Sequence, residues 1–256
     1  MEEKDYLLKK NIKCPVCEAK IQVLALKSGK VVRTESDMDL RPRNTNGFDS
    51  LKYGAYSCPV CGYTALSRTF DEILRPQRKL VKEQIQANFV PKAEEPLETY
   101  SYDDAIKMHK MALLTAMVKR AKMSEKAYTA LVIAWLWRGK RELLTAEDEE
   151  RVAKEEAPVN GAEVMECINT EREHLKMAYD GFVTAMAEEV PPFIGMDMTT
   201  TEYLMAALAY EIGNYEDAAK LISRVITDKY VNSRVKNKAL DIKDKILGAI
   251  REKEEA

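Results

Sequence analysis

The chain has 256 residues and a mass of 29.1 kDa, a length that fits one large domain or two of ordinary size. Hydrophobic residues make up 46% of it and charged residues 32%, which excludes a disordered tail and a membrane protein. The longest unbroken apolar run, residues 130–137, is far shorter than the ~20 residues that cross a bilayer. Because the charged N-terminus also lacks a secretory signal pattern, we expect a soluble protein in the cytoplasm.

Charge divides the chain into two parts. Residues 1–91 hold 16 basic and 11 acidic side chains, a net charge of +5, and the remaining 165 residues hold 24 and 31, a net charge of −7. The change coincides with the segment Pro91–Pro96, whose two prolines interrupt regular structure. We therefore predict a head with a connecting helix over residues 1–91 and a helical domain over residues 97–256.

The head shows short β and helical patterns. They predict a β hairpin formed by Ile21–Leu26 and Lys30–Thr34, followed by a loop over Leu40–Leu51. A further strand is predicted over Tyr53–Tyr56, and a helix that Pro76 kinks or splits over Phe70–Ile85. The turn of the hairpin would be Ser28-Gly29.

The second part has apolar residues at helical spacing almost throughout. This periodicity predicts helices over Tyr102–Lys122, Ser124–Arg138, Gly161–Glu189, Thr199–Ile212, Tyr215–Thr227 and Ser233–Glu252. Ser124 and Thr199 are candidate N-caps, and Gly213-Asn214 is a turn between two helices. The charged stretch from Glu142 to Asn160 gives a weaker signal, for a short helix around Ala146–Ala157.

Four cysteines carry the strongest chemical signal. They form two CPxC pairs, Cys14-Pro15-Val16-Cys17 and Cys58-Pro59-Val60-Cys61-Gly62. Each pair can bring two sulfurs to one point, so together they offer four thiolates to a tetrahedral ion. We predict that Cys14, Cys17, Cys58 and Cys61 bind one Zn²⁺, and that the ion contributes to folding.

Other roles for these cysteines are open but less favoured. Disulfides do not suit a cytoplasmic chain, and a dithiol redox role lacks the βαβ context that usually surrounds it. Four thiolates also bind iron, as in rubredoxins. A site filled by four cysteines has no open position for a substrate, so we expect a structural ion and no catalysis.

The helical part contains a repeated residue pattern. A small-x3-large-x2-small spacing recurs at Ala105/His109/Ala112, Ala178/Phe182/Ala185 and Ala218/Ile222/Val225. This pattern resembles tetratricopeptide repeats, most closely over residues 201–228, although the copies lie at irregular intervals. The predicted fold class is mainly α with a small α+β zinc-binding head and tetratricopeptide-like antiparallel helix pairs, and the last helix would be a solvating cap.

Several other residues invite a functional role, but packing explains them better. His109 occupies the large-residue place of the first repeat, and His174 lies on a polar helix face. We expect Cys167 to pack as a small hydrophobe and Trp135 and Trp137 to belong to the core.

A basic stripe is the one candidate for phosphate binding. On a continuous helix, Arg68, Arg75, Lys79 and Lys82 share one face. Acidic residues flank the stripe, so we favour an ordinary solvated face over a nucleic-acid contact.

The two CPxC pairs, with the CPxCGY form at Cys58–Tyr63, resemble one family when they are combined with Ala134-Trp135-Leu136-Trp137-Arg138 and Gly213-Asn214-Tyr215-Glu216-Asp217-Ala218. It is an uncharacterised bacterial domain-of-unknown-function family found widely in anaerobic and spore-forming bacteria. The resemblance implies a cytoplasmic zinc-binding protein and supplies no catalytic residue. The first pair departs from the pattern, because Glu18 stands where the second has a glycine.

The sequence as a whole favours binding over turnover. We expect a non-enzymatic, zinc-stabilised scaffold that takes a protein or peptide partner in a groove of its helical array. Two alternatives are a rubredoxin-like iron electron carrier and a zinc-ribbon module that binds nucleic acid.

Overall fold

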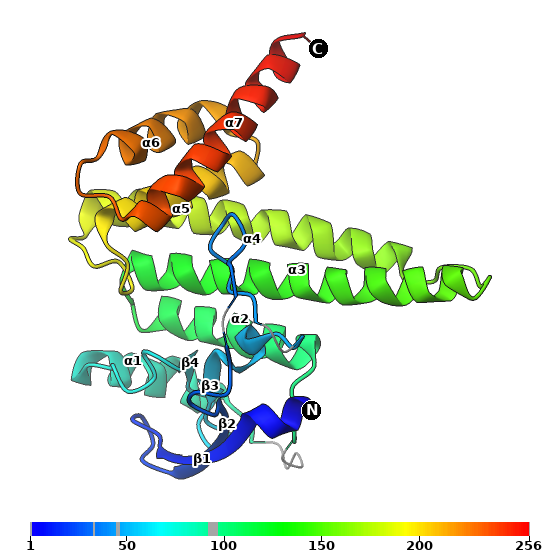
Figure 1. Cartoon of the computed structure of the whole chain (residues 1–256). Coiled ribbons are helices and arrows are strands. Elements are labelled where there is room, and N and C mark those ends of the chain that lie inside the picture. Colours follow the sequence, from blue (N-terminus) through cyan, green and yellow to red (C-terminus); the bar gives the residue numbers. More distant parts are fainter. Residues whose placement is uncertain (1, 33, 45–46, 92–96, 256) are drawn as a thin grey trace. The chain divides into compact units, whose positions relative to one another are not determined.

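We describe a computed structural model of the chain that covers residues 2–32, 34–44, 47–91 and 97–255 (Figure 1). The chain is mainly α-helical with a small α+β head, as its sequence predicts. None of the helices in these residues is long and apolar enough to cross a membrane. The elements are η1 (Glu3–Tyr6), β1 (Leu7–Lys13), β2 (Lys20–Leu26), η2 (Ser50–Tyr53), β3 (Ala55–Ser57), β4 (Thr64–Leu66), α1 (Arg75–Gln84), η3 (Gln86–Asn88), α2 (Tyr102–Val118), α3 (Met123–Ala153), α4 (Gly161–Glu188), α5 (Met198–Glu211), α6 (Tyr215–Thr227) and α7 (Ser233–Glu255).

The contacts divide the chain into two compact units. Unit 1 comprises residues 1–34, 42–121 and 132–171, and unit 2 comprises residues 35–41, 122–131 and 172–256. These units differ from the predicted domains, because α2 belongs to the same unit as the head. Most of the predicted boundary segment, residues 92–96, lies outside the described residues. Whether either predicted domain folds alone stays a prediction.

Two antiparallel hairpins form the β structure of the head. β1 pairs with β2 from Leu7↔Leu26 to Lys13↔Lys20, and β3 pairs with β4 from Ala55↔Leu66 to Ser57↔Thr64. The predicted strand at Ile21–Leu26 is therefore confirmed, but its predicted partner is wrong. None of the described residues in Lys30–Thr34 belongs to a strand, and the true partner, β1, precedes the first cysteine pair.

Helix α2 covers the second hairpin of unit 1, and α1 packs against α2. Pro76 lies in the first turn of α1, where its missing N–H leaves no hydrogen bond unmade, so it starts the helix and does not kink it. α2 packs on β3 and β4. Gly54, just before β3, allows this approach, because a Cβ there would lie 3.0 Å from Nε2 of His109. Tyr53 and Tyr100 stack with ring centroids 5.3 Å apart beside the same helix.

Helices α3 and α4 run antiparallel, each with residues in both units. Within unit 1, Arg138 and Lys140 of α3 pair with Glu171 and Glu163 of α4. Within unit 2, Ser124 donates to Glu189 through both its N–H and its hydroxyl. α3 continues to Ala153, so the helix predicted to end at Arg138 absorbs most of the charged stretch that follows it.

The last three helices form the main part of unit 2. α6 packs against both α5 and α7. Gly213, at φ 83°, makes the turn between α5 and α6, and Asn214 caps α6 by accepting from the N–H of Asp217. The N-cap of α5 is Asp197 and not the predicted Thr199. The observed helix pair agrees with the sequence pattern, while its assignment to a tetratricopeptide-type repeat stays a prediction.

Candidate metal centre

Each cysteine pair forms the turn of one hairpin of the head. Residues 14–19 join β1 to β2, and residues 58–63 join β3 to β4. The two turns have the same backbone hydrogen bonds: Cys14 N–H donates to Ala19 O and Cys58 N–H to Tyr63 O, at 2.9 and 2.8 Å. Two local hairpins of one design therefore present two sulfurs each.

The fourth residue after the first cysteine of each pair has the same conformation in both turns, although its type differs: it is Glu18 in the first turn and Gly62 in the second. Glu18 N–H donates to Cys14 O and Gly62 N–H to Cys58 O, at 3.0 and 2.9 Å. Glu18 adopts φ 65° and Gly62 φ 75°, both in the left-handed region. The glutamate thus takes the conformation of the glycine, at some cost in backbone strain, and the missing glycine leaves the hydrogen-bond pattern intact.

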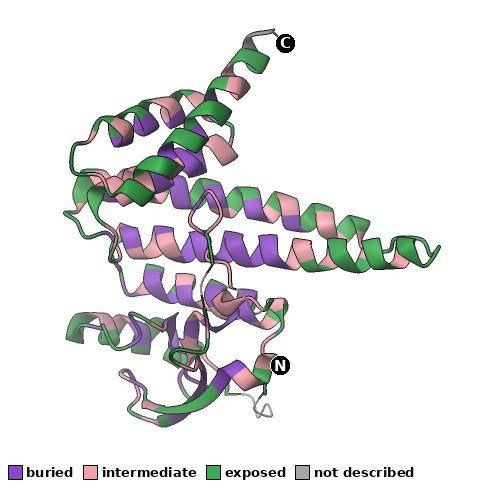
Figure 2. Ribbon diagram, viewed as in Figure 1, coloured by how far each residue is buried: buried purple, intermediate pink, exposed green. Residues whose placement is uncertain are grey.

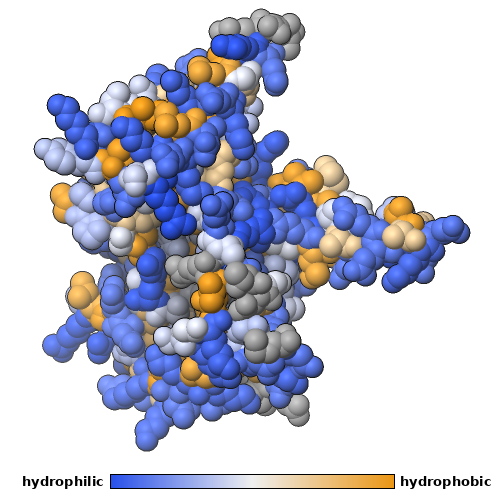
Figure 3. Space-filling model, viewed as in Figure 1, coloured by the Kyte–Doolittle hydropathy of each residue, from blue (hydrophilic) through white to orange (hydrophobic). Residues whose placement is uncertain are grey.

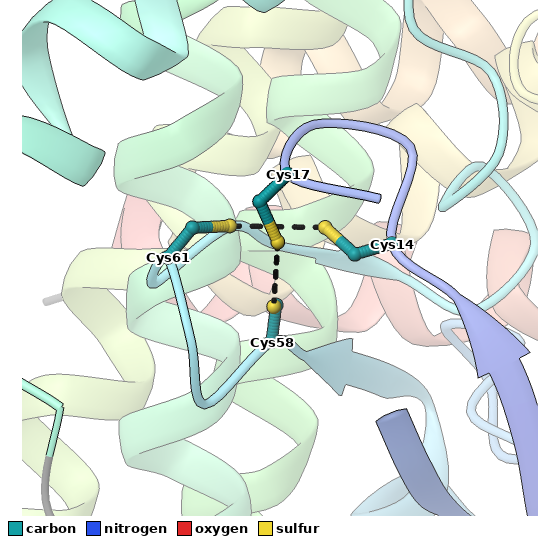
Figure 4. Close-up of side chains that lie close together, drawn as sticks. All are labelled: Cys14, Cys17, Cys58 and Cys61. Carbon is teal, nitrogen blue, oxygen red and sulfur yellow. Dashed lines mark hydrogen bonds between the residues drawn. The ribbon is translucent and has the colours of Figure 1, made fainter. Parts of the chain in front are cut away.

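The four sulfurs converge on one point (Figure 4). Sγ of Cys14 lies 3.7 Å from that of Cys61, and Sγ of Cys17 lies 3.6 Å from that of Cys58. All four sulfurs lie within 4.8 Å of one another. A tetrahedron of sulfurs at a Zn–S distance of ~2.3 Å has edges of about 3.8 Å, so the cluster is close to the size that such an ion needs. The four cysteines could hold a metal ion.

The cluster sits in the hydrophobic core of the head. Cys14, Cys58 and Cys61 are fully buried, and Cys17 is partly buried. Residues packed with the cluster include Tyr63, whose hydroxyl donates to Phe70 O at 2.9 Å. Sulfurs this close and this deeply buried lose most contact with water, so their charge must be balanced locally.

Hydrogen bonds set the charge of the sulfurs. The bond with Cys58, followed by the bond with Cys61, lowers the pKa of the Cys14 thiol far below its usual value. The bond with Cys14 in turn raises the pKa values of Cys58 and Cys61. Backbone N–H groups of the turns add to the stabilisation of thiolate, as where Val16 N–H donates to Cys14 Sγ at 3.4 Å. The arrangement favours a thiolate at Cys14 and protonated thiols at Cys58 and Cys61, and a metal that binds all four sulfurs would release those protons.

The remaining candidates lie elsewhere, in packing roles. Within the described residues, the four cysteines are the only group of three or more His, Cys, Asp or Glu side chains close enough to hold a metal ion. His109 is fully buried, its Nδ1 lies 2.7 Å from Ala105 O, and burial lowers its pKa to about 4. Cys167, Trp135 and Trp137 are buried, as predicted, and His174 is partly exposed on α4.

The predicted basic stripe is incomplete. Arg68 lies in a turn before α1 and not on the helix, because the helix begins only at Arg75. The continuous helical face assumed for the stripe is therefore wrong, and only Arg75, Lys79 and Lys82 share α1. Lys79 also lies 3.8 Å from Glu83.

Sequence reasoning missed one polar contact within unit 2. Residues 35–41 form a tight loop that Tyr203 and Lys238 hold by its backbone: Tyr203 Oη donates to Met38 O at 2.7 Å, and Lys238 Nζ to Ser36 O at 2.9 Å. Asp39 in this loop is fully buried. The two hydrogen bonds join residues 165 and 202 positions apart, and no local pattern signals them.

Comparison with known proteins adds a family and no activity. The family model that matches, over residues 7–246, is described as an uncharacterized protein conserved in bacteria (DUF2225). No curated protein matches the chain. No solved structure matches it either.

Proposed function

The chain belongs to this uncharacterised family conserved in bacteria, and we propose that it is a non-enzymatic protein-interaction scaffold of the cytoplasm, stabilised by zinc. The chemistry of the cysteine cluster supports the part of the proposal that concerns zinc and the lack of catalysis. Four sulfur ligands fill every position of a tetrahedral ion, which leaves none for substrate or water. The ion would tie together two hairpins with strands of seven and three residues.

Zinc is favoured over iron because structural sites of four cysteines commonly hold it. Elemental analysis and an optical spectrum of protein from cells with both metals available test this choice. We expect one zinc per chain and no visible absorption. A red protein with one iron per chain would instead identify a rubredoxin-like centre.

A hollow on the helices of unit 2 supports the part of the proposal that concerns a protein partner. Its volume is about 520 Å³, and it lies where the first turn of α3 meets the C-terminal half of α4. Met123 and Met177 supply flexible apolar surface, and Met177 is 51% exposed. Met-lined surfaces suit peptide partners because the side chain adapts its shape. Glu173, Lys176 and Asp180 line the hollow with charges of both signs.

This hollow is the observation that carries the scaffold proposal, and its test is a comparison of two methionines. A full-length, metal-loaded chain is used to recover partners from the native bacterium, and each partner is then purified and its Kd measured. We expect Met177→Glu to weaken binding at least tenfold, because a charge enters the apolar hollow. Met198→Glu on α5, at a position 40% exposed, serves as the matched control.

Two results would contradict the scaffold. One is a purified partner whose affinity is equal for the wild type and for Met177→Glu. The other is catalysis: conversion of a metabolite by the purified chain with a kcat in the range of ordinary enzymes, about 1 s⁻¹ or more. Folding of both variants is verified from their circular dichroism and metal content.

A further inference from the structure

The far ends of α3 and α4 form a helical hairpin that has no hydrophobic core. All ten residues from Ala130 to Gly139 on α3 are buried, whereas none of the 25 residues from Glu142 to Glu166 is (Figure 2). We call residues 142–166 the hairpin tip. In a globular protein, helices are stabilised mainly by a buried face, which the tip lacks.

The tip is nevertheless held in a specific conformation. The carboxylate of Asp148 accepts the backbone N–H groups of Val159, at 2.9 Å, and Asn160, at 3.1 Å. Asn160 Nδ2 donates to Leu144 O at 3.2 Å, and Arg151 Nε donates to Ala157 O at 3.0 Å. Polar bonds thus fix the loop and align the two helices where no core does so.

Apolar side chains lie exposed on this ordered surface. Leu143, Val152, Val159 and Met165 are each between 48% and 65% exposed. A hollow of about 370 Å³ lies between the helices, and it is lined by Val152, Gly161 and Val164 together with Thr145, Asp148 and Glu149. Figure 3 shows apolar patches on the same end of the two helices, among hydrophilic residues.

Charge at the tip is strongly negative. Nine acidic and two basic side chains give residues 142–166 a net charge of −7. This equals the whole excess of acid over base in residues 92–256, so the rest of that stretch is neutral. Arg151 is paired with Glu156 at 3.1 Å, and two of the nine carboxylates, Glu142 and Glu163, are paired with Arg43 and Lys140 outside the tip. Nucleic acid and anionic lipid would be repelled from such a surface.

We propose that the hairpin tip is a docking surface for a basic amphipathic helix of a partner protein. Apolar residues of that helix would enter the hollow beside Val152, and lysines or arginines on its flanks would face the surrounding carboxylates. The exposed part of α3 from Glu142 to Ala153 has 12 residues, about 18 Å of helix, which matches a partner of three turns.

A second copy of the chain fits the surface less well. Its basic helix α1 carries Arg75, Arg78, Lys79 and Lys82, but Val81 of that helix is fully buried in the head of its own chain. The free side of α1 therefore offers charge without a row of apolar anchors. The proposed surface is distinct from the hollow at Met177, so the two proposals can fail separately.

The test uses a labelled 14-residue peptide of leucine and lysine at helical spacing, and full-length, metal-loaded protein. Fluorescence anisotropy compares it with a peptide of the same composition in which leucine and lysine alternate. We expect the helical peptide to bind at least tenfold more tightly. Val152→Ser with Met165→Ser should weaken its binding at least fivefold, and Glu149→Lys with Glu155→Lys at least tenfold. Met198→Ser and Glu216→Lys are the matched controls outside the tip.

These exposed substitutions leave the core untouched, so binding is compared only among variants with wild-type circular dichroism and metal content. Equal binding of the two peptides would overturn the proposal, because charge alone would then explain it. Equal effects of the tip variants and their controls would overturn it too. So would a dimer in sedimentation equilibrium that Val152→Ser abolishes, which would assign the tip to a second copy.

Discussion

Replacing Gly62 by alanine tests whether the second cysteine turn depends on a residue without a side chain. Gly62 adopts φ 75°, and a Cβ there would lie 2.5 Å from Cδ2 and 2.8 Å from Cγ of Phe89. The backbone strain of an L-residue in this region is about 1–2 kcal/mol. Forcing a methyl group into filled space adds about 1–3 kcal/mol.

A matched glycine separates the two effects. Gly29 has nearly the same φ, 77°, but no atom lies within 4 Å of its would-be Cβ. Gly29→Ala therefore carries the strain and the change in chain entropy without the clash. We expect Gly62→Ala to reduce the free energy of unfolding of the head by about 2 kcal/mol more than Gly29→Ala does, about 30-fold in the opening equilibrium.

The assay is hydrogen exchange of the most protected amides in β1–β4 of the metal-loaded chain. The same substitution is also made in a Phe89→Ala background, where the ring is gone and the excess penalty of Gly62→Ala should vanish. An equal penalty in both backgrounds would refute the clash. So would a Gly62→Ala effect no larger than that of Gly29→Ala.

Three other substitutions test the metal centre and the buried polar groups. Cys61→Ser should lower the bound zinc from one ion to none or a weakly held one, measured by elemental analysis after dialysis. His109 has a folded pKa of about 4, below its unfolded value of 6.5, so its contribution to stability is complete above pH 6.5 and falls as the pH drops toward 4. Between pH 6.5 and pH 4, the free energy of unfolding measured in urea should fall by up to about 3 kcal/mol more for the wild type than for His109→Gln. Parallel plots of this free energy against pH for the two proteins would contradict the prediction. Glu171→Ala leaves Arg138 buried without its carboxylate and should destabilise the chain by about 3–5 kcal/mol, whereas the exposed Glu173→Ala should change the melting temperature very little.

The sequence predicts the metal ligands and most helices because both are encoded locally. Two CPxC turns specify their own hydrogen bonds within six residues, and α6 shows apolar periodicity because only one of its faces, with Ala218, Leu221, Ile222 and Val225, is buried. β1 escapes prediction for the opposite reason. Five of its seven residues, including Lys9 and Lys10, are exposed, and only pairing with β2 makes the segment a strand.

Elements without a buried face are harder to recognise from sequence. The second half of α3 has the charged composition of a solvated segment, and it continues as a helix through its contacts with α4 and its helix-forming residues. The loop at residues 35–41 is harder still. Its position is fixed by hydrogen bonds from Tyr203 and Lys238, which lie far from it in the sequence. The residues of the loop itself give no signal that predicts these hydrogen bonds.

The path of the backbone limits how this protein could be divided. The chain passes from one compact unit to the other five times, at residues 34/35, 41/42, 121/122, 131/132 and 171/172. Two of these passages, 131/132 and 171/172, lie inside α3 and α4, so a cut there would interrupt a helix. No single stretch of sequence contains either unit alone. A gene fragment ending anywhere between residues 97 and 171 would remove part of the sulfur-bearing unit, and one starting after residue 41 would lack the first cysteine pair and the loop that Tyr203 holds.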